Sequence, residues 1–114
     1  MVDDDRQLAD TMADILHYEG YSTWSVATID EARECMAIWP PDLLICDIRL
    51  DVACEGYDFA LELRAAPETA QLPIILMSGW MLLGDIELAP PFAKLGKPFD
   101  SARLAELAER LTTR

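Results

Sequence analysis

Four segments of the chain carry hydrophobic residues at helical spacing. In the first, Leu8, Met12 and Leu16 fall on one helical face, and Gly20 follows as a typical stop signal. The last segment begins at a capping residue, either Asp100 or Ser101. The pattern predicts helices over residues 6–19, 30–39, 57–66 and from that cap to Leu111.

Strands are predicted where apolar residues run together or alternate with polar ones. The runs Leu43–Cys46 and Pro73–Met77 are continuous, as expected of strands that are buried on both faces. Weaker patterns predict a short strand over Ser22–Ala27 and a short edge strand over Phe92–Leu95. Strands that alternate with helices pair in parallel through right-handed crossovers. The sequence therefore predicts one α/β domain over residues 1–114.

Two segments fit this pattern poorly. Only Met1 and Val2 precede a run of three aspartates, so the first strand is expected to be nearly absent. A central strand this short leaves backbone groups of its neighbours unpaired, which predicts either residues upstream of Met1 or an unusually unstable domain. Residues 80–91 lack a clear period and predict one or two short helical turns.

Composition and charge restrict the class of protein. Hydrophobic residues make up 52% of the chain and charged residues 26%, which is typical of a globular domain. The net charge of −12 disfavours binding to nucleic acid, because phosphate backbones are repelled. We find no apolar run long enough to span a bilayer. The three cysteines match no zinc pattern and indicate a reducing, cytoplasmic setting.

Polar residues gather where the predicted strands end. Asp3 and Asp4 follow the first strand, Asp47 and Ser78 end the two buried runs, and Lys97 follows the edge strand. In small doubly wound sheets these ends form the ligand site. Carboxylates that face each other need a cation between them, and oxygen ligands suit Mg²⁺. A carboxylate can also accept a phosphoryl group, whose transfer requires nearby positive charge.

With these residues in these positions, the sequence resembles the receiver domain of two-component response regulators, the CheY-like family. The resemblance covers nearly the whole chain, and its motifs are Val2–Asp5, Leu43–Asp47, Pro73–Gly79 and Lys97–Asp100. It implies a doubly wound, five-stranded parallel sheet of order 2-1-3-4-5 with helices on both faces, the CheY-like form of the flavodoxin-like fold.

The resemblance also implies a role for each polar residue. Asp47 is the expected phosphoacceptor, and Ser78 and Lys97 are expected to contact the phosphoryl group. The lysine precedes Pro98 by a peptide bond that is cis in the family. The expected Mg²⁺ ligands are Asp3, Asp4, Asp47 and the backbone carbonyl of Arg49, with Asp4 more direct than Asp3.

For function, the resemblance implies a signalling domain. A histidine kinase or a histidine phosphotransfer protein would supply the phosphoryl group, and a downstream protein would read the change in conformation. The domain would catalyse its own phosphorylation and dephosphorylation, but it would not be an enzyme with a metabolic substrate. No binding to nucleic acid and no insertion into a membrane are expected.

The sequence departs from the family pattern at several positions. Asp51 stands where the family has a proline, and Lys94 stands where it has its switch aromatic. The segment between Ser78 and Lys97 is short and contains two adjacent prolines. In this respect the chain is more similar to stand-alone receivers and receivers of hybrid kinases than to those that drive DNA-binding domains.

Two other functions are compatible with the same residues. One is a degenerate receiver that binds a protein without being phosphorylated, for which Asp51 and Lys94 are the signs. The other is a small phosphatase with an aspartyl-phosphate intermediate. It is disfavoured because such sites carry a second aspartate two residues after the nucleophile, where this chain has Arg49.

Overall fold

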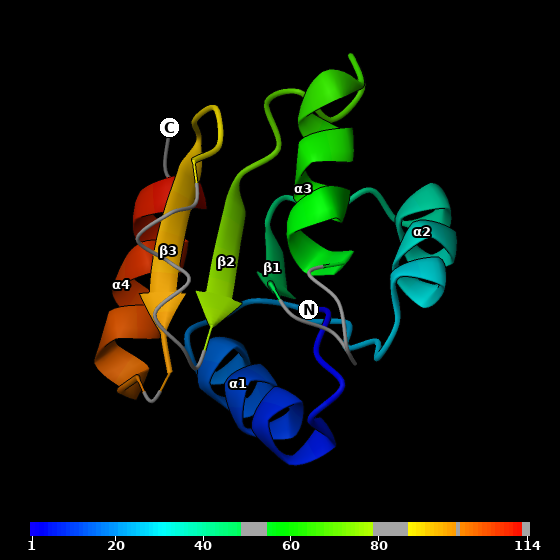
Figure 1. Cartoon of the computed structure of the whole chain (residues 1–114). Coiled ribbons are helices and arrows are strands. Elements are labelled where there is room, and N and C mark those ends of the chain that lie inside the picture. The colour runs from blue at the N-terminus through cyan, green and yellow to red at the C-terminus, as the bar shows by residue number, and fades with distance from the viewer. Residues whose placement is uncertain (49–54, 79–86, 98, 113–114) are drawn as a thin grey trace.

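The computed structural model describes residues 1–48, 55–78, 87–97 and 99–112, and Figure 1 shows their arrangement. The described residues form three strands and four helices, close to those that the hydrophobic pattern predicts. Their bounds lie within about two residues of the predicted ones. The elements are α1 (Arg6–Tyr18), α2 (Ile29–Ile38), β1 (Leu44–Asp47), α3 (Glu55–Ala65), β2 (Ile74–Ser78), β3 (Phe92–Gly96) and α4 (Ser101–Thr112).

The strands form a parallel sheet in the order β1-β2-β3. Val2 extends this order, because it forms parallel bridges with Cys46 of β1 on one side and with Val26 on the other. The sequence of neighbours is therefore Val26, Val2, β1, β2 and β3, which is the predicted order 2-1-3-4-5. The first two positions of the sheet are single bridges among the described residues, and the others are strands.

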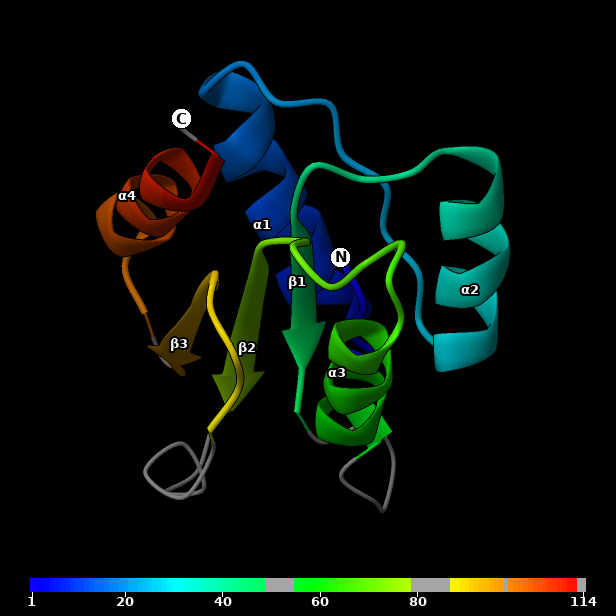
Figure 2. The same cartoon turned by 90° about the horizontal axis from the view of Figure 1, so that it is seen from above.

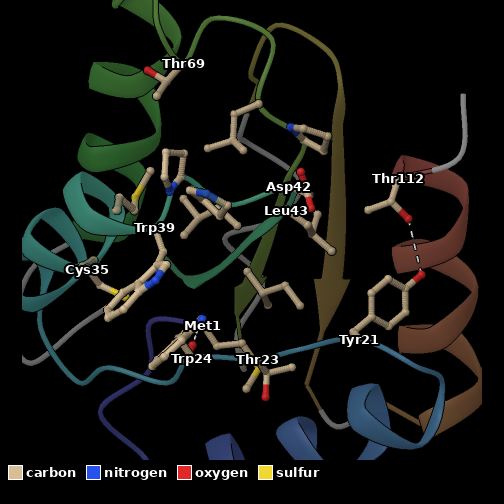
Figure 3. Close-up of a pocket in the computed structure, with 18 of the residues that line it drawn as sticks. Met1, Tyr21, Thr23, Trp24, Cys35, Trp39, Asp42, Leu43, Thr69 and Thr112 are labelled. Carbon is tan, nitrogen blue, oxygen red and sulfur yellow. Dashed lines mark hydrogen bonds between the residues drawn. The ribbon is translucent and has the colours of Figure 1, made fainter.

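The prediction of a strand over Ser22–Ala27 is wrong, because only Val26 pairs with the sheet. The strand was predicted from the alternation of Trp24 with Val26, but the Trp24 ring has a different partner. Its indole stacks on that of Trp39, at the end of α2, with ring centroids 4.6 Å apart and an interplanar angle of 13° (Figure 3). The aromatic contact accounts for the apolar residue at position 24, while the Trp24 carbonyl accepts a hydrogen bond from the Met1 ammonium at 2.6 Å outside any strand ladder.

The core has two layers, one on each face of the sheet. Side chains of alternate strand residues point to opposite faces, so Leu44 and Cys46 pack against α2 and α3, while Ile45 packs against α1 and α4. Figure 2 shows the two pairs of helices on the two sides of the sheet. This double coverage explains why β1 and β2 are continuous apolar runs.

Side chains that accept hydrogen bonds cap several of the helices. The Asp5 carboxylate accepts the amide of Leu8 in α1, at 3.1 Å. The Asp100 carboxylate accepts the amide of Arg103 at 2.7 Å, so Asp100 rather than Ser101 caps α4. None of the described helices is both long enough and apolar enough to cross a membrane.

Candidate functional site

The carboxyl ends of the strands bring the predicted site residues together. Asp47 is the last residue of β1, Ser78 is the last residue of β2, and Lys97 follows β3. Backbone hydrogen bonds fix these ends to each other. The amide of Asp47 donates to the carbonyl of Val2 at 2.9 Å, and the amide of Lys97 donates to that of Ser78 at 2.8 Å. Asp3 therefore lies beside Asp47, and Lys97 reaches both from the edge strand.

The Lys97 ammonium joins two buried carboxylates. Its Nζ lies 2.6 Å from Oδ2 of Asp47 and 3.3 Å from Oδ2 of Asp3. Asp3 is 1% exposed and Asp47 is 7% exposed, so both carboxylates are largely shielded from water. The other oxygen of Asp3 accepts the amide of Asp5 at 2.9 Å. Hydrogen bonds from charged groups in such surroundings are stronger than those between neutral groups.

The electrostatics of the site follow from this burial. Burial raises the pKa of Asp3 above its ordinary value, although the Asp5 amide and the Lys97 ammonium act in the opposite direction. Burial alone would lower the pKa of Lys97. The hydrogen bonds and charges of Asp47 and Asp3 outweigh it, so the pKa of Lys97 lies above its ordinary value. The site therefore holds a charged ammonium at neutral pH.

The three predicted metal-binding aspartates form one cluster. Asp3, Asp4 and Asp47 each offer a carboxylate oxygen, and these oxygens lie within 4.8 Å of one another. Asp4 is exposed to solvent while the other two are buried, so the cluster is open on one side. Oxygen donors at an open site fit Mg²⁺, which keeps several of its water ligands. The residues present therefore suit the metal that the fold family implies.

The structure adds one residue that the sequence did not single out, Gly56 in the first turn of α3. A Cβ atom at this position would lie 1.7 Å from the carbonyl oxygen of Asp47 and 3.1 Å from Sγ of Cys46. The Gly56 amide donates to the carbonyl of Ile48 at 3.0 Å. The start of α3 is therefore packed directly on the backbone of Asp47. A glycine nine residues after an aspartate gives no sign of this contact in the sequence.

Cys46, the residue before Asp47, is a core residue, as expected. It is fully buried, and burial together with the negative charge of Asp47 raises the pKa of its thiol to about 12. The thiol is therefore neutral at physiological pH and adds no second nucleophile beside Asp47.

Several of the sequence predictions lie outside the described residues. These are the Arg49 carbonyl as a metal ligand, the Asp51 substitution, the cis bond to Pro98 and most of the segment expected to form short helical turns. Ser78 is placed as expected, buried at the end of β2.

Comparison with known proteins agrees with this geometry. The family model described as the response regulator receiver domain matches residues 1–109. The curated nitrogen assimilation regulatory protein NtrX of Azorhizobium caulinodans is 31% identical over 96% of this chain. The match covers 25% of that protein, so the chain spans about a quarter of the length of its curated relative.

Two solved structures show the same fold. The receiver domain of NtrX from Brucella abortus has a TM-score of 0.85 and 28% identity, covering 97% of this chain and 94% of that one. The receiver domain of a signal transduction histidine kinase from Syntrophus aciditrophicus has a TM-score of 0.85 and 26% identity, covering 98% and 86%. With the family model matched over residues 1–109, the chain belongs to the response regulator receiver domain family.

Proposed function

We propose that this receiver domain accepts a phosphoryl group on Asp47 from a phosphohistidine, with Mg²⁺ bound, and passes the signal on by a change in conformation. The donor would be a histidine kinase or a histidine phosphotransfer protein, in the cytoplasm. The observation that carries the proposal is the Lys97 ammonium held between the buried carboxylates of Asp47 and Asp3. This arrangement puts a nucleophile and a compensating charge side by side.

In the proposed reaction, an Asp47 carboxylate oxygen attacks phosphorus as the phosphorus–nitrogen bond of the phosphohistidine breaks. The imidazole leaves with the bonding electrons, and an acyl phosphate forms on Asp47. Lys97 donates to a phosphoryl oxygen and neutralises part of its charge, and the Ser78 hydroxyl donates to another in this proposal. Mg²⁺ held by Asp3, Asp4 and Asp47 would supply further positive charge at the same oxygens.

Hydrolysis of the acyl phosphate ends the signal. Water attacks phosphorus, the bond to Asp47 breaks, the carboxylate is regenerated and inorganic phosphate is released. The domain thus catalyses one phosphorylation and one hydrolysis on itself, without turning over a metabolic substrate. The intact set of Asp3, Asp4, Asp47 and Lys97 supports this function over a degenerate receiver.

The proposal predicts that phosphoramidate or acetyl phosphate, with Mg²⁺, adds one phosphoryl group to the wild-type chain. Intact-mass spectrometry measures the addition, and the Asp47→Asn variant is expected to show none because it lacks the nucleophile. Omission of Mg²⁺ should suppress uptake as well. An unchanged mass of the wild type under these conditions would favour the degenerate receiver. Sustained release of phosphate from small phosphate esters would instead favour the phosphatase.

The metal cluster predicts unequal roles for two neighbouring aspartates. Both oxygens of Asp3 already accept hydrogen bonds, from the Asp5 amide and from Lys97, whereas Asp4 is exposed. Asp4→Ala is therefore expected to weaken Mg²⁺ binding about tenfold, equivalent to about 1.4 kcal/mol, and Asp3→Ala to weaken it less. Calorimetric titration measures both. Asp5→Ala is the matched control: it removes the cap of α1 but leaves the cluster, so Mg²⁺ affinity should not change.

A further inference from the structure

Two side chains of α3, Tyr57 and Arg64, hold residues 87–91, here called the strap, against that helix. The Tyr57 hydroxyl donates to the carbonyl of Glu87 at 2.9 Å, and Nε of Arg64 donates to that of Ala89 at 2.6 Å. Arg64 also donates to the carbonyl of Pro91. Three alternate carbonyls of the strap therefore point to one helix face, on which the two side chains stand two turns apart.

The strap is also connected to the sheet. Leu88 packs against the hydrophobic cluster on the α2 and α3 side, and the Pro91 carbonyl accepts the amide of Ile74 at 3.2 Å. A further nitrogen of Arg64 donates to the carbonyl of Leu72 at 2.7 Å, just before β2. One guanidinium thus joins the segments that lead into β2 and β3 to the end of α3. Its hydrogen bonds are with backbone carbonyls, and burial lowers the pKa of Arg64.

These contacts complete a closed path that passes through the phosphoacceptor. The strap leads directly into β3, which is followed by Lys97, and Lys97 contacts the Asp47 carboxylate. The backbone of Asp47 in turn contacts Gly56 at the start of α3. The helix then returns to the strap through Tyr57 and Arg64.

We propose that Tyr57 and Arg64 are positioning residues that couple the occupancy of Asp47 to the position of the strap. This inference rests on the proposed function. A phosphoryl group on Asp47 places its oxygens where the Lys97 ammonium now meets the carboxylate, so the ammonium is displaced, and in this proposal the end of β3 moves with it. The start of α3 stays against the Asp47 backbone, because Gly56 packs on its carbonyl. A displacement of β3 relative to α3 therefore changes the hydrogen bonds that join the strap to α3.

The first test is hydrogen exchange at the Glu87, Leu88 and Ala89 amides, resolved by NMR. Tyr57→Phe removes the hydroxyl that donates to Glu87 and is expected to speed this exchange about two- to tenfold, the effect of one hydrogen bond. Tyr21→Phe is the matched control, because its hydroxyl lies 3.4 Å from that of Thr112, away from the strap. It should leave these amides unchanged. Arg64→Lys, which keeps the charge but loses the planar fork, should act like Tyr57→Phe.

The second test perturbs the other end of the path. Asp47→Asn removes the charge that Lys97 contacts, and it is expected to change exchange at the same strap amides at least twofold. In the double variant with Tyr57→Phe the two effects should not add, because they act on one path. Unchanged strap amides in Asp47→Asn, or additive effects in the double variant, would overturn the coupling.

The hydrogen-exchange results and the test of the proposed function can fail independently. The proposed function is tested by phosphoryl uptake, which intact-mass spectrometry measures. If the wild type takes up no phosphoryl group, the proposed function fails, and the response of the strap to Asp47→Asn still decides whether the path exists. If uptake occurs, Tyr57→Phe should still be phosphorylated, while phosphorylation should change its strap exchange less than in the wild type. An equal change in both proteins would contradict the inference.

Discussion

The Lys97→Met variant is expected to take up phosphoryl groups about 100- to 1000-fold more slowly than the wild type, the usual cost of removing one preorganised donor from a developing anion. Lys97 lies 2.6 Å from the proposed nucleophile, and its pKa lies above the ordinary value because two carboxylates face it. Methionine keeps much of the volume but removes the charge. The measurement is the initial rate of mass increase with phosphoramidate and Mg²⁺, with circular dichroism to confirm folding.

Lys94→Met provides the matched control on the same strand. Lys94 lies in the edge strand β3, three residues before Lys97, where it pairs with Leu76 of β2, and no ion pair involving it is found among the described residues. The same change in net charge should therefore leave the rate within about twofold of the wild type. Mg²⁺ should bind Lys97→Met more tightly, since the ammonium no longer competes for Asp47 and Asp3. A rate for Lys97→Met close to that of Lys94→Met would contradict the assigned role.

The parts of the fold that the sequence predicts well are those covered on both faces. β1 and β2 are continuous apolar runs because successive side chains enter opposite cores, and a continuous run has few other interpretations. The prediction for the segment Ser22–Ala27 is wrong because alternation over so few residues does not specify a strand. Trp24 can bury its ring against the sheet or stack on another aromatic, and the deciding partner, Trp39, lies fifteen residues away.

The site was predictable for a topological reason. Asp3, Asp47 and Lys97 are far apart in sequence, but parallel strands place their carboxyl ends at one edge, so the strand ends alone indicated the cluster. The distances within it, and the contacts of α3, depend on how a helix sits on the sheet. Tyr57 and Arg64 donate hydrogen bonds to backbone carbonyls of a segment more than twenty residues later. Because every residue has a backbone carbonyl, the sequence does not indicate which ones accept these bonds.

Gly56→Ala is expected to lower the free energy of unfolding by about 3 kcal/mol, at the upper end of the usual cost of overpacking. The sign is opposite to that expected of an ordinary helix, where alanine is favoured over glycine by about 0.5–1 kcal/mol. The reason is the 1.7 Å approach of the added Cβ to the Asp47 carbonyl oxygen, a backbone atom that cannot rotate away. Either α3 or β1 must move.

A shift of either element displaces the Asp47 carboxylate relative to Lys97, so phosphoryl uptake should also fall, by about 100-fold for a displacement near 1 Å. Gly20→Ala separates this effect from a general cost of replacing glycine. Gly20 has a φ of 97°, and a Cβ atom added there would meet nothing within 4 Å, so alanine strains only the local backbone, by about 1–2 kcal/mol. Its rate of uptake should match the wild type. A Gly56→Ala protein with wild-type stability and rate would show that α3 tilts away from β1 at no cost, and that its contact with Asp47 does not position the nucleophile.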